Sequence, residues 1–157
     1  MGGQWLRWLL LAVVLAVPAL ATTRYFAVTG TNQNPCTEAL PCLTAGPYEA
    51  ELQPGDRLLF RRGDTFRGTQ FQLLPVRSGT ADAPLYYGAY GQGAKPVLDS
   101  GDPTFAGGGG ADGLKAVTTD WLVIEDLAFV GWGSALDLRG VRDVVVRRVQ
   151  STGGSSE

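Results

Sequence analysis

Apolar and polar residues follow the same order twice in the last third of the chain. The first copy, WLVIEDLAFVGW, begins at Trp121, and the second, DVVVRRVQSTGG, begins 22 residues later at Asp143. The apolar positions at the start of each copy alternate with polar or exposed ones, which is typical of a strand with one buried face. Three apolar pairs align on this offset: Leu122 with Val144, Ile124 with Val146, and Leu127 with Val149.

Short apolar segments bounded by turn-forming residues recur along the rest of the chain. We expect strands at 25–28, 57–60, 71–76, 85–90, 96–99, 122–124, 127–130, 136–138 and 144–146, and one helical turn at 48–52. About three short strands in a repeat of about 22 residues favour a parallel β-helix, in which each strand pairs with its equivalent one coil away. The pattern therefore predicts an all-β solenoid.

Charged residues at the repeat offset have opposite signs. Glu125 and Asp126 lie 22 residues before Arg147 and Arg148. On adjacent coils these residues would stack as ion pairs, each worth about 0.2–1 kcal/mol. We therefore interpret both pairs first as structural features of a solvated outer face.

The N-terminus has the three parts of a secretory signal peptide. Arg7 precedes an uninterrupted apolar run over 8–17, and Pro18 and Ala19-Leu20-Ala21 follow it. The run is short for a hydrocarbon core of about 30 Å, so a retained transmembrane anchor is the less favoured alternative. Cleavage after Ala21 would give a secreted, periplasmic or otherwise extracellular protein with no membrane contact.

Composition excludes several classes of function. The chain has 13 basic and 15 acidic residues without a basic run, which argues against a nucleic-acid partner. It contains no histidine, so a histidine-based catalytic triad or a histidine-ligated zinc site is excluded. Its 22 glycines and 9 prolines suit short strands joined by many turns.

The two cysteines, Cys36 and Cys42, stand in the segment PCTEALPC. In an exported protein such a pair predicts a disulfide that closes a small loop. The alternative, a redox-active pair, lacks the C-x-x-C spacing.

Three blocks of the sequence resemble the N-terminal portion of secreted right-handed parallel β-helix proteins of the pectate-lyase-like superfamily. They are YFAVTGTNQNPCTEALPC, LQPGDRLLFRRGDTFRG, and SGTADAPLYYGAYGQGAKPVLDSG followed by WLVIEDLAFVG and LDLRGVRDVVVRRV. The resemblance implies three regions: a signal peptide at 1–21, an N-terminal strand and cap with the Cys36–Cys42 loop at 22–55, and the first coils of the β-helix at 56–157. Since members have many more coils, and terminal coils need a cap, we expect the sequence to be a fragment of a longer protein.

The resemblance implies a protein that processes extracellular polysaccharides, with a lyase acting on acidic glycans as the leading hypothesis. Such lyases use Lys or Arg as the base and Ca²⁺ or Arg to neutralise the uronate, whereas glycoside hydrolases use two carboxylates. Catalytic residues of either kind would lie here or beyond residue 157. The alternative is a non-catalytic cell-surface or adhesin-like β-helix that binds glycans or partners.

Seven residues are candidates for this chemistry, each with a structural alternative. Asp137, Arg139 and Lys115 are catalytic candidates, although a solvated outer face explains them as well. Trp132 and Tyr90 could stack on sugar rings or cover the edge of the core. Asp99 and Asp102 could bind Ca²⁺ or simply form turns.

Overall fold

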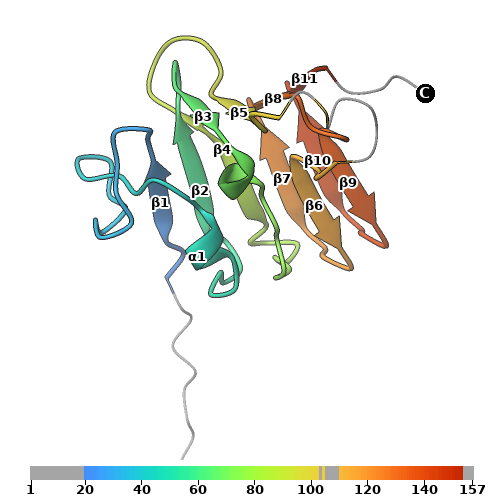
Figure 1. Cartoon of the computed structure of the whole chain (residues 1–157). Coiled ribbons are helices and arrows are strands. Elements are labelled where there is room, and N and C mark those ends of the chain that lie inside the picture. Colours follow the sequence, from blue (N-terminus) through green and yellow to red (C-terminus); the bar gives the residue numbers. More distant parts are fainter. Residues whose placement is uncertain (1–19, 103, 105–109, 154–157) are drawn as a thin grey trace, which may run out of the picture.

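The protein is built from short strands in three parallel sheets, with almost no helix (Figure 1). The computed structural model describes residues 20–102, 104 and 110–153. The signal peptide predicted for residues 1–21 falls almost entirely outside this part of the chain. No helix in the described part is long and apolar enough to cross a membrane.

Eleven strands and two short helical turns make up the described fold. The helical turns are α1 (Gly46–Glu49) and the 3-10 turn η1 (Thr69–Phe71). The strands are β1 (Thr23–Phe26), β2 (Arg57–Arg61), β3 (Thr65–Arg67), β4 (Leu85–Tyr90), β5 (Val97–Asp99), β6 (Leu114–Val117), β7 (Leu122–Glu125), β8 (Ala128–Val130), β9 (Leu136–Arg139), β10 (Val144–Arg147) and β11 (Gln150–Thr152).

From β6 onward, the chain adds one strand to the third, the first and the second sheet in turn. The first sheet has the order β1-β2-β4-β7-β10, the second β11-β8-β5-β3, and the third consists of β6 and β9. In Figure 1 the colours run across the molecule from β1 in blue at one end to β9, β10 and β11 in orange and red at the other. Position along the sequence therefore corresponds to position along the stack of strands.

The 22-residue offset between the two copies is confirmed by the pairing of the strands. Val144 pairs with Leu122, and Val146 with Ile124, in the first sheet. Ser151 pairs with Phe129 in the second sheet, and Asp137 pairs with Lys115 in the third. Each strand of the second copy thus lies beside its equivalent in the first.

The corners of the chain repeat on the same offset. Four positions between residues 118 and 131 have a left-handed backbone, and each has a left-handed counterpart 22 residues later. The pairs are Thr118 and Gly140, Trp121 and Asp143, Asp126 and Arg148, and Gly131 and Gly153. A left-handed residue changes the direction of the chain. Because these turns recur at the same offset, consecutive segments follow the same path and stay in register.

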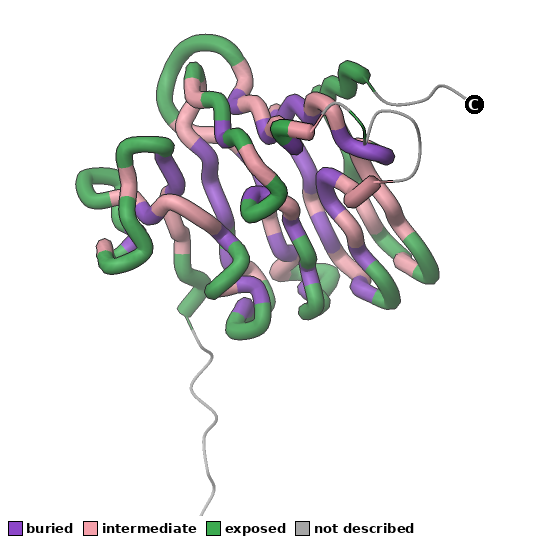
Figure 2. Tube along the Cα trace, viewed as in Figure 1, coloured by how far each residue is buried: buried purple, intermediate pink, exposed green. Residues whose placement is uncertain are grey.

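The core lies between the sheets and is lined by one face of most strands (Figure 2). Leu85 and Leu122 are register partners on neighbouring strands of the first sheet and are fully buried. At the N-terminal end, Phe26 stacks on Phe60, with 5.1 Å between the ring centroids. Such a ladder of like side chains is what parallel pairing at a fixed register produces.

The strand predicted at 71–76 is wrong. The chain forms η1 there, followed by a single bridge between Leu73 and Leu114. Pro75 has no N–H to give to a sheet, and the N–H of Leu74 donates to the Glu49 carboxylate at 2.8 Å instead of to a strand. Conversely, β11 was not expected because its residues, Gln-Ser-Thr, are polar.

The predicted ion pairs of the repeat are confirmed, but one of them is not on a solvated face. Arg147 lies 2.6 Å from Glu125, and Arg148 lies 2.8 Å from Asp126. Only 7% of the Glu125 side chain is exposed, and its carboxylate also accepts a hydrogen bond from the Tyr86 hydroxyl at 3.1 Å.

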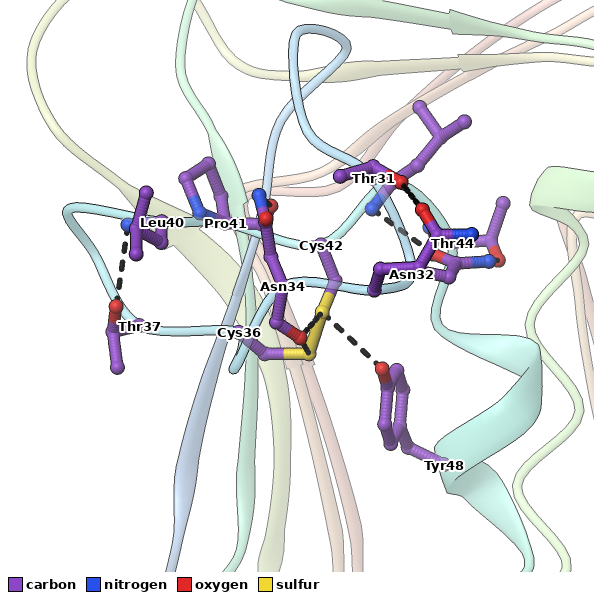
Figure 3. Close-up of a disulfide and its surroundings, with 12 residues drawn as sticks. Thr31, Asn32, Asn34, Cys36, Thr37, Leu40, Pro41, Cys42, Thr44 and Tyr48 are labelled. Carbon is purple, nitrogen blue, oxygen red and sulfur yellow. Dashed lines mark hydrogen bonds between the residues drawn. A yellow bond between two sulfur atoms is a disulfide. The ribbon is translucent and has the colours of Figure 1, made fainter.

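The predicted disulfide joins Cys36 to Cys42, and its loop covers the free edge of β1 (Figure 3). The Tyr25 N–H donates to the Cys36 carbonyl at 2.8 Å, and the Tyr25 carbonyl accepts from the Cys42 N–H at 2.9 Å. Ala27 donates to the Cys42 carbonyl at 3.0 Å. The loop thereby satisfies backbone groups that would otherwise leave this edge open to pairing with another chain.

We expect the double substitution Cys36→Ser, Cys42→Ser to lower the free energy of unfolding by about 2 kcal/mol, because a short cross-linked loop constrains the unfolded chain by that amount. Urea denaturation of both proteins measures the effect. Reductant should destabilise only the wild-type protein. A double variant as stable as the wild type would show that the loop is held by its hydrogen bonds alone.

Candidate functional site

A hollow of about 420 Å³ lies between the disulfide loop and the ends of β2 and β4. A volume of this size is in the range of small-molecule sites. Polar side chains come from all three segments that meet there. The lining residues are Thr29, Glu38, Ala39, Pro41, Arg61, Arg62, Tyr90, Gly91 and Gln92. We refer to it as the Tyr90 hollow.

Two guanidinium groups, of Arg61 and Arg62, and one carboxylate, of Glu38, line the Tyr90 hollow. Arg61 Nε donates to both carboxylate oxygens of Asp64, at 3.0 and 3.1 Å, and 37% of its side chain is exposed. Arg62 Nη2 lies 2.8 Å from Asp126 Oδ2. Because a guanidinium carries five N–H donors, both arginines keep donors for an anionic ligand after binding these carboxylates.

Tyr90 ends β4 at the edge of the hollow, and its ring is half-buried. The ring meets that of Tyr25 edge to face, with 5.0 Å between centroids. Burial raises the pKa of the Tyr90 hydroxyl, partly offset by the positive charge of Arg61. The hydroxyl therefore stays protonated at neutral pH and can act as a hydrogen-bond donor. Its role in stacking on a sugar remains a prediction.

A second hollow, of about 380 Å³, crosses the ends of the strands of the second sheet. One residue from each strand lines it in register: Arg67, Asp99, Val130 and Thr152. Gly131 and Gly153, both with a left-handed backbone, follow two of these strands and leave the surface open. This groove contains the two residues considered for Ca²⁺.

Asp99 and Asp102 do not fit a calcium site in this arrangement. Asp99 Oδ1 accepts the N–H of Gly101 at 2.9 Å, and Asp99 Oδ2 lies 3.7 Å from Arg67 Nε. Asp102 Oδ1 accepts two hydrogen bonds from Thr104, which lower the pKa of Asp102. Ca²⁺ needs six or more converging oxygens, and the described residues include no group of three or more potential metal ligands.

The three catalytic candidates come together on the third sheet. Lys115 Nζ lies 3.6 Å from Asp137 Oδ2 and 3.7 Å from Asp112 Oδ2. Arg139 Nε donates to Asp137 Oδ1 at 2.7 Å. This hydrogen bond is the main reason that the pKa of Asp137 is lowered and the pKa of Arg139 is raised. The cluster is therefore a set of ion pairs with no neutral group ready to accept a proton.

Trp132 is not available for stacking on a sugar, so that prediction is wrong. Only 2% of the residue is exposed. Its indole Nε1 donates to the carbonyl of Leu98 at 2.8 Å inside the core. A buried tryptophan that meets its one hydrogen-bond requirement is a packing residue.

Sequence reasoning missed the two arginines of the Tyr90 hollow and the buried carboxyl group of Glu49. The arginines follow an apolar strand in the series RLLFRR, which resembles an ordinary strand end. Glu49 lies in α1, is buried, and has its pKa raised from 4.5 to about 7 by desolvation. Its proximity to the buried Tyr87 across the fold leaves no mark in the local sequence.

The fold resembles that of three carbohydrate-active enzymes of known structure. The GH136 lacto-N-biosidase from Eubacterium ramulus superposes with a TM-score of 0.59 at 24% identity, over 73% of this chain and 21% of that one. Pectate lyase Pel9A gives 0.54 at 20% identity, over 71% of this chain and 28% of the lyase. A rhamnogalacturonan lyase gives 0.51 at 20% identity, over 70% of this chain and 29% of that enzyme.

These similarities agree with the expected pectate-lyase-like fold and, at this level of identity, concern the fold alone. The chain spans less than a third of the length of each of these enzymes. No protein-family model matches the sequence, and no curated protein matches it.

Proposed function

We propose that this chain forms the first coils of a right-handed parallel β-helix protein that processes acidic polysaccharides outside the cell. The parallel sheets, the repeat of 22 residues and the disulfide are compatible with this architecture and location. The structural neighbours support it because a lacto-N-biosidase, a pectate lyase and a rhamnogalacturonan lyase all act on glycans. Within this class, a lyase is the proposed activity of the whole protein.

The observation that carries the proposal is the chemistry of the Tyr90 hollow. An acidic sugar presents a carboxylate and an apolar ring face. Arg61 and Arg62 offer guanidinium donors that suit a carboxylate, and Tyr90 offers an aromatic edge and a protonated hydroxyl. The two guanidinium groups favour a uronate over a neutral sugar, provided that the sugar's carboxylate lies on their side of the hollow and its hydroxyl groups face Glu38, which also lines it.

A lyase also needs a base beside the carbon atom that loses its proton. Lys115 and Arg139 remain the proposed candidates in this chain, with Asp137 as the residue that orients both. Their positive charges are bound to carboxylates, so either group would have to leave Asp137 before it could reach a substrate.

Because Lys115 and Arg139 are both paired with Asp137, a second candidate function is glycan binding without catalysis. The two are distinguished by an assay of the protein that contains this chain on polygalacturonate. Release of unsaturated products would support the lyase, and binding without such release or new reducing ends would support the binding protein.

We expect Arg61→Gln to weaken binding of an oligogalacturonate by about tenfold, because it removes one charge-assisted hydrogen-bond donor to the carboxylate. Isothermal titration calorimetry on the full chain measures the affinity. Gln can still donate to Asp64, so the fold should be preserved, and the melting temperature checks this.

The matched control is Arg77→Gln, which removes the same charge from an exposed arginine that contacts only the carbonyl of Ala50 in the described structure. This variant should bind as the wild type does. Equal loss in both variants would indicate a general charge effect, and equal affinity for a neutral oligosaccharide would argue against a site for acidic sugars.

A further inference from the structure

Each charged residue of the repeat that begins at Lys115 lies beside a residue of opposite charge in the next repeat. That segment, residues 115–136, contains four charged residues, and the residue 22 positions later has the opposite sign in each case. All four pairs are in contact: Lys115 with Asp137 at 3.6 Å, Asp120 with Arg142 at 3.2 Å, Glu125 with Arg147 at 2.6 Å, and Asp126 with Arg148 at 2.8 Å. We call these four pairs the charge ladder.

A charged side chain inside the stack can form an ion pair on each of its two sides. Asp126 binds Arg62 through Oδ2 and Arg148 through Oδ1, each at 2.8 Å. Among residues 20–102, 104 and 110–153, the arginines at the far end of the ladder have carboxylate partners on one side only. The side chains of Arg147 and Arg148 are each 55% exposed, and that of Arg142 is more exposed still.

The apolar face of the same edge is also uncovered. Leu122 and Ile124 are fully buried, whereas their partners one repeat later, Val144 and Val146, are exposed to solvent in part, Val146 to 42%. In Figure 2 the purple of the buried positions gives way to pink and green at this end of the stack. Asp137 Oδ2, on β9 at the same edge, is shielded from solvent and has no hydrogen-bond partner among the described residues.

We propose that the edge formed by β9, β10 and β11 binds a parallel β-coil that carries carboxylates opposite Arg142, Arg147 and Arg148 and a basic side chain opposite Asp137. The coil would pair with all three sheets at once and cover Val146. It would give each arginine of the edge a carboxylate on its outer side, as Asp126 already has one arginine on each of its two sides.

A second copy of the chain does not supply such a coil. In the first sheet, parallel pairing with β10 would require the copy to present the opposite edge, which is β1. The backbone of β1 is already hydrogen-bonded on that side to Cys36 and Cys42. The occupant is therefore a coil of different sequence, specified by its charges.

The test adds one coil to the full chain in two versions. Glu157 lies 22 residues after Ala135, so a copy of residues 136–152 appended after Glu157 falls into the register of the repeat. One version keeps the native charges and so places like charges together. The other carries Asp137→Lys, Arg142→Asp, Arg147→Glu and Arg148→Asp within the copy and so continues the charge ladder.

We expect the β10 amides to exchange with solvent at least about fivefold more slowly in the charge-reversed version, since each of four pairs changes the equilibrium by about 1.5- to 5-fold. The difference should shrink at high salt, which screens exposed charges. Equal protection in both versions, or protection in neither, would overturn the proposal. So would a dimer of the unextended chain with protected β10 amides, because the edge would then be a self-interface. None of these outcomes depends on glycan binding.

Discussion

Replacing Trp132 by alanine should lower the free energy of unfolding by about 3–5 kcal/mol, the range for removal of a large aromatic side chain from a core. The indole is 2% exposed and bridges two repeats, since its N–H binds the Leu98 carbonyl of β5. The substitution removes the packing and also leaves that carbonyl without its partner. Urea denaturation followed by circular dichroism measures the change.

Two further variants separate the contributions. Trp132→Phe keeps a ring in the core but loses the N–H, so its effect should be intermediate, with about 1–3 kcal/mol from the unpaired carbonyl. Val117→Ala, at a position that is 47% exposed, should change stability by less than about 0.5 kcal/mol. If Trp132→Ala cost less than about 1 kcal/mol, the indole would not be the packing residue that the structure indicates.

Glu49 should make the protein less stable as the pH rises from 4.5 to 7. Burial raises the pKa of its carboxyl from 4.5 to about 7, so the folded protein binds a proton that the unfolded chain releases. The contribution of this proton to the free energy of unfolding is fully present below pH 4.5 and is lost once the pH exceeds 7. Its size is about 3 kcal/mol, from about 1.4 kcal/mol for each pKa unit.

The matched experiment compares the wild type with Glu49→Gln over this pH range. Glutamine can still accept the Leu74 N–H but does not ionise. The variant should equal the wild type below pH 4.5 and exceed its stability by about 3 kcal/mol above pH 7. Glu51→Gln, at an exposed position two residues away, is the control for charge alone.

The shape of the pH dependence separates burial of the carboxyl group from a general effect of the substitution. A wild-type protein whose stability differs from that of Glu49→Gln by a constant amount across the range would contradict the burial of an ionisable group at this position.

The repeat could be predicted because it leaves a direct record in the sequence. Pairing in a parallel sheet aligns equivalent residues, so Leu122 and Val144 must both be apolar, and Glu125 and Arg147 can compensate each other's charge. These constraints act at one fixed offset. The apolar pattern therefore predicted most of the strands, and it failed at 71–76, where Pro75 and the Glu49 carboxylate compete for the backbone.

The candidate site was only partly predictable. Tyr90 was expected as a sugar contact, and the structure places it in a hollow, but with Arg61, Arg62 and the disulfide loop rather than with any other candidate. The members of the hollow come from segments separated by up to about 60 positions in the chain. No local pattern specifies which of the many turns meet.

The sequence by itself determined the parallel all-β class, the 22-residue register, the disulfide and the charge pairs of the repeat, because each depends on residues at fixed spacing. Only the tertiary structure decided that Trp132 is buried, that Glu49 is shielded from water, that Asp99 and Asp102 do not converge with other ligands, and that arginines gather around Tyr90. The physical reason is that burial and the approach of distant charges depend on how the sheets close around the core. That closure involves strands from the whole described chain, so it cannot be predicted from any single segment.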